Sequence, residues 1–265
     1  MRILVRGGGD LASGVVVRLH RAGWQVIVAE LPQPLAVRRN VSFAEAVYAG
    51  SIAVEEVPAR LVDNLAGAES AFSQGAVPVI VDPSLSLLDA YAPQVLIDGR
   101  MRKKSPEVGL TVAPLVIGLG PGFTASKDCH AVIETNRGPF LGRVIWEGQA
   151  QADTGIPESM GNFSAERVLR APVEGMLESR ADIGEHVVRG DVIALVAGQP
   201  VLAPFDGVLR GLAHPGLMVK KDEKIGDVDP RDDPRLCWLV SDKALSVGGG
   251  VLEAILTWKP IREHL

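Results

Sequence analysis

Cysteine and aromatic residues are scarce in this sequence. Only two of its 265 residues are cysteines, Cys129 and Cys237, and aromatic side chains make up 5%. Two cysteines cannot build the disulfide framework of a small secreted domain, so we expect a cytoplasmic protein with reduced thiols. Because aromatic residues are few, the core is expected to consist of valine, leucine, isoleucine and alanine. Arginines interrupt the apolar run at the start of the chain, so no signal peptide is expected.

The sequence also lacks a basic excess and a long apolar helix. Its 27 basic and 32 acidic side chains give a net charge of −5, so we do not expect a nucleic-acid partner. Residues 108–126 carry no charge, but four glycines and two prolines interrupt this stretch. Such a stretch fits a buried strand that runs into a glycine-rich loop better than a membrane-spanning helix, and no membrane partner is expected.

Glycine, by contrast, is abundant, with 29 residues. The pattern Gly7-x-Gly9-x-x-Ala12 follows one apolar run, opens a helical pattern and is followed by a second apolar run. This order of strand, glycine turn, helix and strand is typical of a parallel sheet and of the dinucleotide-binding fingerprint. Further unbroken apolar runs suit central strands covered on both faces. We therefore predict a Rossmann-like α/β domain with a parallel sheet.

Glycine, acidic and basic residues follow several of the predicted strands. Because the carboxyl ends of parallel strands share one edge of a sheet, these loops are expected to converge there. Glycine N–H groups at a helix start can hold a phosphate, and Glu30 stands where a ribose-binding carboxylate would. The carboxylate of Asp10 would repel a pyrophosphate. The alternatives are a purely structural turn at the glycines and a solvated surface loop at the basic residues. The candidate binding residues are Gly7, Gly8, Gly9, Asp10, Ala12, Glu30, Arg38, Arg39, Asp98, Arg100, Lys103, Lys104, Gly118, Gly120 and Gly122.

A second candidate site is the run Asp128-Cys129-His130. A nearby imidazole can lower the pKa of a thiol and make it a nucleophile, so these three residues are the candidate catalytic group. Neighbouring residues of a strand point to opposite faces, however, and burial of Cys129 as a structural residue is the alternative. No pattern of clustered cysteines and histidines occurs, so no metal site is expected.

The C-terminal part of the chain contains an internal duplication. Residues 171–196 align without gaps with residues 203–228, and nine of the 26 positions are identical. The two copies resemble the barrel-sandwich hybrid of biotinyl and lipoyl carriers. Its hairpin, residues 194–202, has no lysine, so neither biotin nor lipoate is expected. We predict a Rossmann-like domain over 1–165, an unacylated hybrid domain over 166–230 and a C-terminal strand and helix over 231–265.

Taken together, several motifs resemble one family, the YqeB-type proteins of the selenium-dependent molybdenum hydroxylase system. The matching motifs are Val5–Gly14, Glu30–Pro32, Pro34–Arg39, Asp98–Met101, Gly118–Phe123, Glu134–Gly138 and Lys224–Arg231. The resemblance implies an accessory factor that matures a molybdenum hydroxylase and binds a phosphate-bearing cofactor at the glycine-rich strand ends. The resemblance does not decide whether this cofactor is the molybdenum cofactor or a nucleotide.

Two enzymatic functions are alternatives to this accessory role. In one, Cys129 carries sulfur or selenium and installs it on the molybdenum cofactor. In the other, which we rank last, the chain is an NAD(P)-dependent oxidoreductase. The expected partners are the client hydroxylase and the phosphate-bearing small molecule, and self-association into a homo-oligomer is left open.

Overall fold

The computed structural model describes residues 1–101, 107, 109–152 and 165–263. Contacts divide the chain into two compact units. Unit 1 contains Met1–Pro34, Ser42–Asp153 and Val240–Leu265, and unit 2 contains Leu35–Val41 and Thr154–Leu239. The division differs from the three predicted segments, because the chain passes twice from unit 1 into unit 2 and the last residues return to unit 1. In the described part of the chain, no helix is long and apolar enough to cross a membrane.

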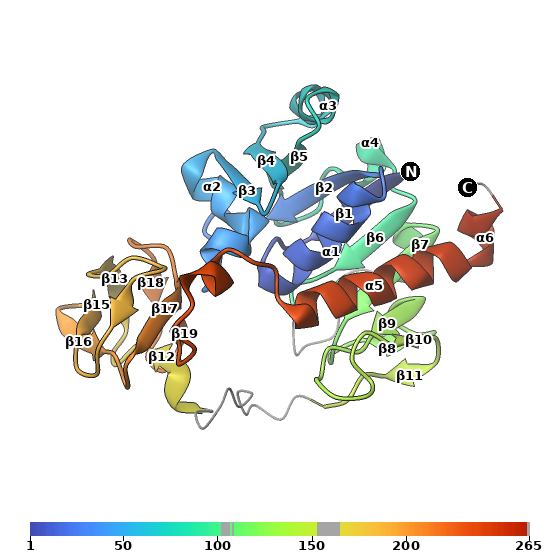
Figure 1. Ribbon diagram of the computed structural model, residues 1–265. Helices are drawn as coiled ribbons and strands as arrows, with labels where there is room; N and C mark the ends of the chain where they lie inside the picture. Colours follow the sequence, from blue (N-terminus) through green and yellow to red (C-terminus); the bar gives the residue numbers. More distant parts are fainter. Residues whose placement is uncertain (102–106, 108, 153–164, 264–265) are drawn as a thin grey trace. The chain divides into compact units, whose positions relative to one another are not determined.

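Unit 1 is built on a mixed sheet in which nine strands are described, in the order β10-β9-β7-β6-β1-β2-β5-β4-β3 (Figure 1). The strands are β1 (Arg2–Arg6), β2 (Gln25–Glu30), β3 (Ser51–Val54), β4 (Val57–Leu61), β5 (Val77–Val81), β6 (Val95–Asp98), β7 (Leu115–Leu119), β9 (Ala131–Ile133) and β10 (Val144–Ile145). The inner strands pair in parallel, whereas β3 and β10 run antiparallel to their neighbours at the two edges. A short antiparallel pair, β8 (Thr124–Ala125) and β11 (Gly148–Gln149), forms a separate small sheet.

Helices and short 3-10 turns connect these strands. The helices of unit 1 are α1 (Asp10–Arg21), α2 (Ala46–Ala49), α3 (Leu65–Ser73), α4 (Leu88–Tyr91), α5 (Asp242–Thr257) and α6 (Lys259–Arg262). The 3-10 turns η2 (Phe43–Glu45) and η3 (Leu110–Val112) also belong to it. The central strands β1 and β6 are almost wholly buried, as expected for apolar runs covered on both faces.

Helices α1 and α5 pack against each other at unusually small side chains (Figure 1). A Cβ atom on Gly14 would stand 2.8 Å from the Ala244 carbonyl oxygen, and one on Gly248 would stand 2.8 Å from the Gly14 carbonyl oxygen. The glycines 248–250 lie inside α5, which begins at Asp242 and is capped by the Ser241 hydroxyl. Gly248 lets the two helices approach, whereas Gly249 has open space beside it and Gly250 lies against the Gly142 carbonyl.

Unit 2 contains the duplicated segment, and its strands reproduce the duplication. Its strands are β12 (Val168–Arg170), β13 (Gly175–Ser179), β14 (His186–Val187), β15 (Val192–Val196), β16 (Gln199–Leu202), β17 (Gly207–Leu212), β18 (Met218–Val219) and β19 (Lys224–Asp229), with 3-10 turns η1 (Arg39–Val41), η4 (Ala165–Arg167) and η5 (Pro234–Cys237). The strands β13 and β17 start 32 residues apart, at Gly175 and Gly207. Each short strand pairs with the long strand of the other copy, β18 with β13 and β14 with β17. The two copies therefore exchange strands.

The predicted fold class is wrong. The sheet of unit 1 is mixed, with antiparallel edges, and is not the parallel Rossmann-like sheet that we expected. In the described part of unit 2, two separate four-stranded antiparallel sheets replace the predicted barrel-sandwich hybrid, in the orders β12-β19-β17-β14 and β16-β15-β13-β18. Apolar runs identified the inner strands, but they do not distinguish parallel from antiparallel partners at an edge. The C-terminal strand predicted within 231–265 is not found among the described residues, where η5 is followed by α5.

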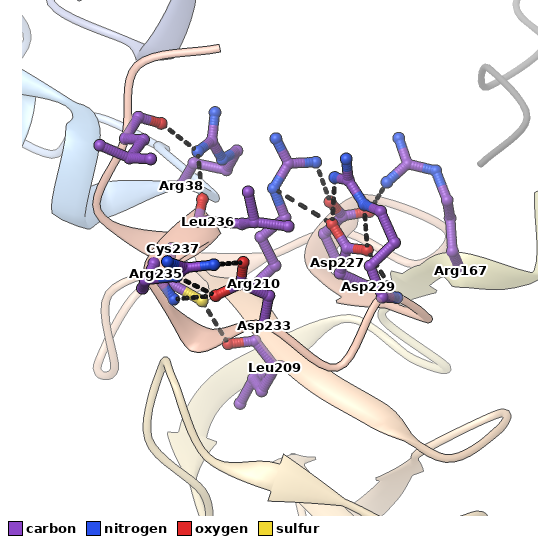
Figure 2. A network of polar contacts seen from close by, with 12 residues as sticks. Arg38, Arg167, Leu209, Arg210, Asp227, Asp229, Asp233, Arg235, Leu236 and Cys237 are labelled. Carbon is purple, nitrogen blue, oxygen red and sulfur yellow. Dashed lines mark hydrogen bonds and ion pairs between the residues drawn. The ribbon is translucent and has the colours of Figure 1, made fainter. Parts of the chain in front are cut away.

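A buried network of arginines and aspartates ties the strands of unit 2 together (Figure 2). The Arg167 guanidinium donates a hydrogen bond of 2.6 Å to Asp227, whose other oxygen lies 3.6 Å from Arg210. Arg231 donates two hydrogen bonds to Asp229 through its guanidinium, at 2.9 and 2.7 Å. Both aspartates are almost inaccessible to solvent. Such charges are tolerated in an interior only when they are paired and hydrogen-bonded.

Candidate functional site

Most of the predicted binding residues of unit 1 gather at the carboxyl edge of the mixed sheet, after β1, β2, β6 and β7. Gly7 has a φ of +91°, which favours glycine, and Gly9 is the N-terminal cap of α1. Ala12 lies behind the loop, where a Cβ on Gly99 would stand only 2.7 Å from the Ala12 Cβ. Asp10 begins α1. The predicted convergence of these loops agrees with the parallel register of the inner strands.

The buried side chain of Glu30 is hydrogen-bonded to the glycine loop. Its carboxylate accepts hydrogen bonds from the backbone N–H groups of Gly8, at 2.5 Å, and Leu31, at 2.7 Å. Burial raises the pKa of this carboxyl group, while the two backbone donors and Arg100 oppose the rise. The Gly8 N–H, which the sequence assigns to a phosphate, is thus used within the protein.

The basic residues of this edge are also engaged. The Arg100 guanidinium donates to both carboxylate oxygens of Asp98, at 3.0 and 2.7 Å, and contacts Glu107 at 3.3 Å. Arg6, which the sequence analysis did not select, is buried and donates to Glu107 at 2.7 Å and to the Pro83 carbonyl at 3.0 Å. Lys103 and Lys104 lie outside the described residues.

The remaining predicted binding residues have structural neighbours. Gly118 lies against the Phe123 ring and Gly120, with a φ of +72°, lies against Thr135, while Gly122 has a φ of +102°. Arg38 and Arg39 belong to unit 2, not to the sheet edge. Arg38 donates to the carbonyls of Leu236 and Leu239, at 3.0 and 2.8 Å, and Arg39 donates to Leu212. Neither arginine therefore belongs to the cluster at the carboxyl edge.

The structure does not bring the side chains of Asp128, Cys129 and His130 together. Cys129 is wholly buried in the apolar core beside Val132 and Phe123, and burial raises the pKa of its thiol to about 12. Asp128 accepts a hydrogen bond from the Thr124 N–H, 2.9 Å away. His130 faces a different environment, against the indole of Trp258. The three side chains thus have three separate sets of partners.

His130 lines a pocket of 460 Å³ at the amino edge of the sheet, opposite the glycine loop. Its other lining residues are Leu110, Ser126, Trp146, Glu147, Thr257, Trp258 and Lys259. The indoles of Trp146 and Trp258 are stacked, with centroids 5.5 Å apart and planes 12° apart. The His130 ring stands 5.0 Å from Trp258 at an angle of 58°. The pocket has the size and aromatic lining that are typical of small-molecule sites.

Hydrogen bonds hold the Trp258 and His130 rings and the backbone at Trp146. The Trp258 indole N–H donates to the Pro114 carbonyl at 3.0 Å, and the Ser126 hydroxyl donates to the Trp146 carbonyl at 2.9 Å. The Nδ1 atom of His130 accepts the Val116 N–H at 2.9 Å, which assigns the ring proton to Nε2. Burial lowers the pKa of this imidazole. Neither tryptophan could be selected from the sequence, because only the fold brings the two together.

The described residues contain no group of three or more His, Cys, Asp or Glu side chains that could hold a metal ion. No family model matches the chain. Solved structures with partial similarity include an aspartoacylase family protein from Mesorhizobium loti, with 10% identity and a TM-score of 0.28, covering 86% of this chain and 83% of that one. A succinylglutamate desuccinylase/aspartoacylase from Rhodobacter sphaeroides shows 22% identity and a TM-score of 0.24, covering 34% and 31%.

The predicted function is wrong as well. A maturation factor that binds an anionic cofactor at the strand ends needs free donors there, but Glu30 takes the Gly8 N–H and Asp98 pairs with Arg100. A sulfur or selenium carrier needs a reactive thiol, but Cys129 is buried and its pKa is raised. The predicted NAD(P) alternative depends on the same loop and is not retained.

One curated relative is similar along nearly the whole chain. It is the uncharacterized protein YqeB of Escherichia coli, 46% identical over 254 residues, which are 96% of this chain. The chain spans about half of that relative, 47% of its length. The predicted resemblance is thereby confirmed at the level of sequence, without the molybdenum hydroxylase role: over the region that they share, this chain is a homologue of YqeB.

Proposed function

We propose that unit 1 is a small-molecule-binding domain and that its ligand site is the tryptophan pocket at the amino edge of the sheet. The observation that carries this proposal is the stacked pair Trp146–Trp258, which lines a pocket of 460 Å³ together with His130. Ligand pockets of proteins are usually concave, mostly apolar and largely preformed, with a few oriented polar groups. This pocket combines two indoles with an imidazole donor.

The carboxyl edge supports ligand binding less well. Its carboxylates and guanidinium groups pair with one another, as in Asp98–Arg100, and its buried Glu30 is bonded to the backbone. A ligand there would have to replace several internal hydrogen bonds. At the amino edge, the Trp258 and His130 rings are already held by backbone groups, so a ligand would meet preformed surfaces.

Indole NMR signals test the proposal, since the chain has four tryptophans and two of them line the pocket. Protein labelled with ¹⁵N-tryptophan gives one indole N–H signal for each residue, assigned by single Trp→Phe variants. Three small probes are titrated separately: choline, 3,3-dimethyl-1-butanol and benzoate. We expect at least one probe to shift the Trp146 and Trp258 signals saturably, while the Trp24 and Trp238 signals stay in place.

Two further variants make the result specific. Ser126→Ala removes the hydroxyl that holds the Trp146 carbonyl and is expected to weaken the binding of that probe. Ser73→Ala removes an exposed hydroxyl that bonds a helix carbonyl outside the pocket, and is the matched control. If none of the three probes shifts the Trp146 or Trp258 signal, or if the shifts are equal at all four tryptophans, the proposed function is overturned.

A further inference from the structure

The charged residues of the tryptophan pocket are not equivalent. The Lys259 ammonium lies 3.8 Å from the Glu263 carboxylate. Lys259 begins α6, and Glu263 directly follows its last residue. The Glu147 carboxylate has neither a hydrogen bond nor an ion pair with any other described residue, and its side chain is exposed at the pocket wall. The pocket therefore offers one uncompensated negative charge and one positive charge that already has a partner.

The aromatic walls of the pocket, like Glu147, favour a positively charged ligand. The face of an indole carries negative electrostatic potential, so it attracts a cation and repels an anion. Two indoles line this pocket, and the His130 ring beside Trp258 is held as the neutral form by the Val116 N–H at its Nδ1 atom. No positive charge on the imidazole then competes with a bound cation.

Resting on the proposed function, we propose that the ligand of this pocket is an organic cation of the alkylammonium class, held by the tryptophan faces with Glu147 as counter-ion. The Nε2–H of His130 is the donor for an oxygen acceptor elsewhere on the same ligand. An anion would meet the carboxylate of Glu147 and two indole faces, and the positively charged side chain among the lining residues, Lys259, already pairs with Glu263. A neutral molecule would gain the aromatic contact without the charge.

A matched pair of probes separates charge from shape. Choline and 3,3-dimethyl-1-butanol have the same branched outline and the same hydroxyl, but only choline is charged. We expect the dissociation constant of choline, measured from the Trp258 indole shift, to be about tenfold lower than that of the neutral alcohol. Glu147→Gln is expected to raise the dissociation constant of choline about fivefold and to leave that of the alcohol unchanged.

The control variant is Glu253→Gln, which removes the same charge from an exposed position of α5 that does not line the pocket. It should leave both dissociation constants unchanged. If the alcohol or benzoate binds as tightly as choline, the cation proposal is overturned while the binding function stands. The same holds if Glu147→Gln and Glu253→Gln weaken choline equally, because the effect is then one of net charge alone. If no probe binds, both proposals fail together.

Discussion

The Nδ1 atom of His130 accepts a hydrogen bond from the backbone N–H of Val116, 2.9 Å away. This bond requires an unprotonated Nδ1, because a protonated nitrogen would face another donor. Since Val116 lies in β7 and His130 directly precedes β9, the bond also joins two neighbouring parallel strands. The protonation of one histidine is thus linked to the stability of unit 1.

His130→Gln should reduce the loss of stability at mildly acidic pH. Burial lowers the pKa of His130 in the folded state below its ordinary value of 6.5. The unfolded chain therefore binds the proton more tightly, so the free energy of unfolding falls as the pH drops below 6.5. Urea unfolding at a neutral and at an acidic pH measures this slope for the wild type and the variant.

The histidine at position 20 supplies an internal comparison. Burial, together with Arg21, also lowers the pKa of His20, so His20→Gln should act in the same direction. The two residues are on different elements, and the double variant should have the shallowest slope. An acid-induced loss as large in His130→Gln as in the wild type would show that the Val116 bond does not control this titration.

Two neighbouring glycines of α5 should respond oppositely to the same substitution. A Cβ on Gly248 would stand 2.8 Å from the Gly14 carbonyl oxygen, so Gly248→Ala should lower the free energy of unfolding by about 1–3 kcal/mol. A Cβ on Gly249 meets no atom within 4 Å, so Gly249→Ala should raise it by about 0.5–1 kcal/mol, as expected for a helix interior. Chemical denaturation of both variants checks the difference in sign. Equal effects would mean that α1 and α5 do not approach as described.

The arginine–aspartate network should be essential to unit 2. Asp227→Asn leaves Arg167 and Arg210 facing a neutral amide in a buried position, which should cost about 3–5 kcal/mol of stability. Asp233→Asn is the matched control, since Asp233 pairs with Arg235, whose side chain is largely exposed (Figure 2). Thermal unfolding of the two variants should show a large loss for the first and little change for the second. Similar losses of stability in both variants would show that the buried network is not essential to unit 2.

Cys129 should be inert in the folded protein. Its thiol is buried, and its pKa is raised to about 12 by burial, so almost no thiolate is present at neutral pH. Iodoacetamide at pH 8 should therefore modify Cys129 only as fast as the protein unfolds, with full modification in denaturant. Mass spectrometry of the peptides follows the reaction, and Cys129→Ser shows the background. Rapid alkylation of Cys129 in the native state would contradict the structure.

The inner strands and the duplication could be predicted from the sequence, because both depend on local patterns. The apolar run at 2–6 is the strand Arg2–Arg6, since flanking arginines mark its ends. The identical positions of the two repeats correspond to equivalent strands, because each copy adopts the same local structure. The antiparallel edges were not predictable, since the pairing of Val144 with Ile133 depends on where the chain returns.

The candidate site was harder to predict than the strands. Trp146 and Trp258 are far apart in the sequence and meet only because α5 folds back onto unit 1. The glycine loop, in contrast, carried a recognisable motif, but the motif does not report that Glu30 occupies the Gly8 N–H. Sequence patterns therefore located the loops of the sheet, whereas the choice between a ligand and an internal partner depends on contacts between distant residues.

The most direct measurement is the set of intermolecular nuclear Overhauser effects between the methyl protons of choline and the protein. We expect effects to the indole protons of Trp146 and Trp258 and to the ring of His130, all of which line the pocket. Effects confined to the glycine loop, such as those to Gly9 at the start of α1, would contradict this expectation.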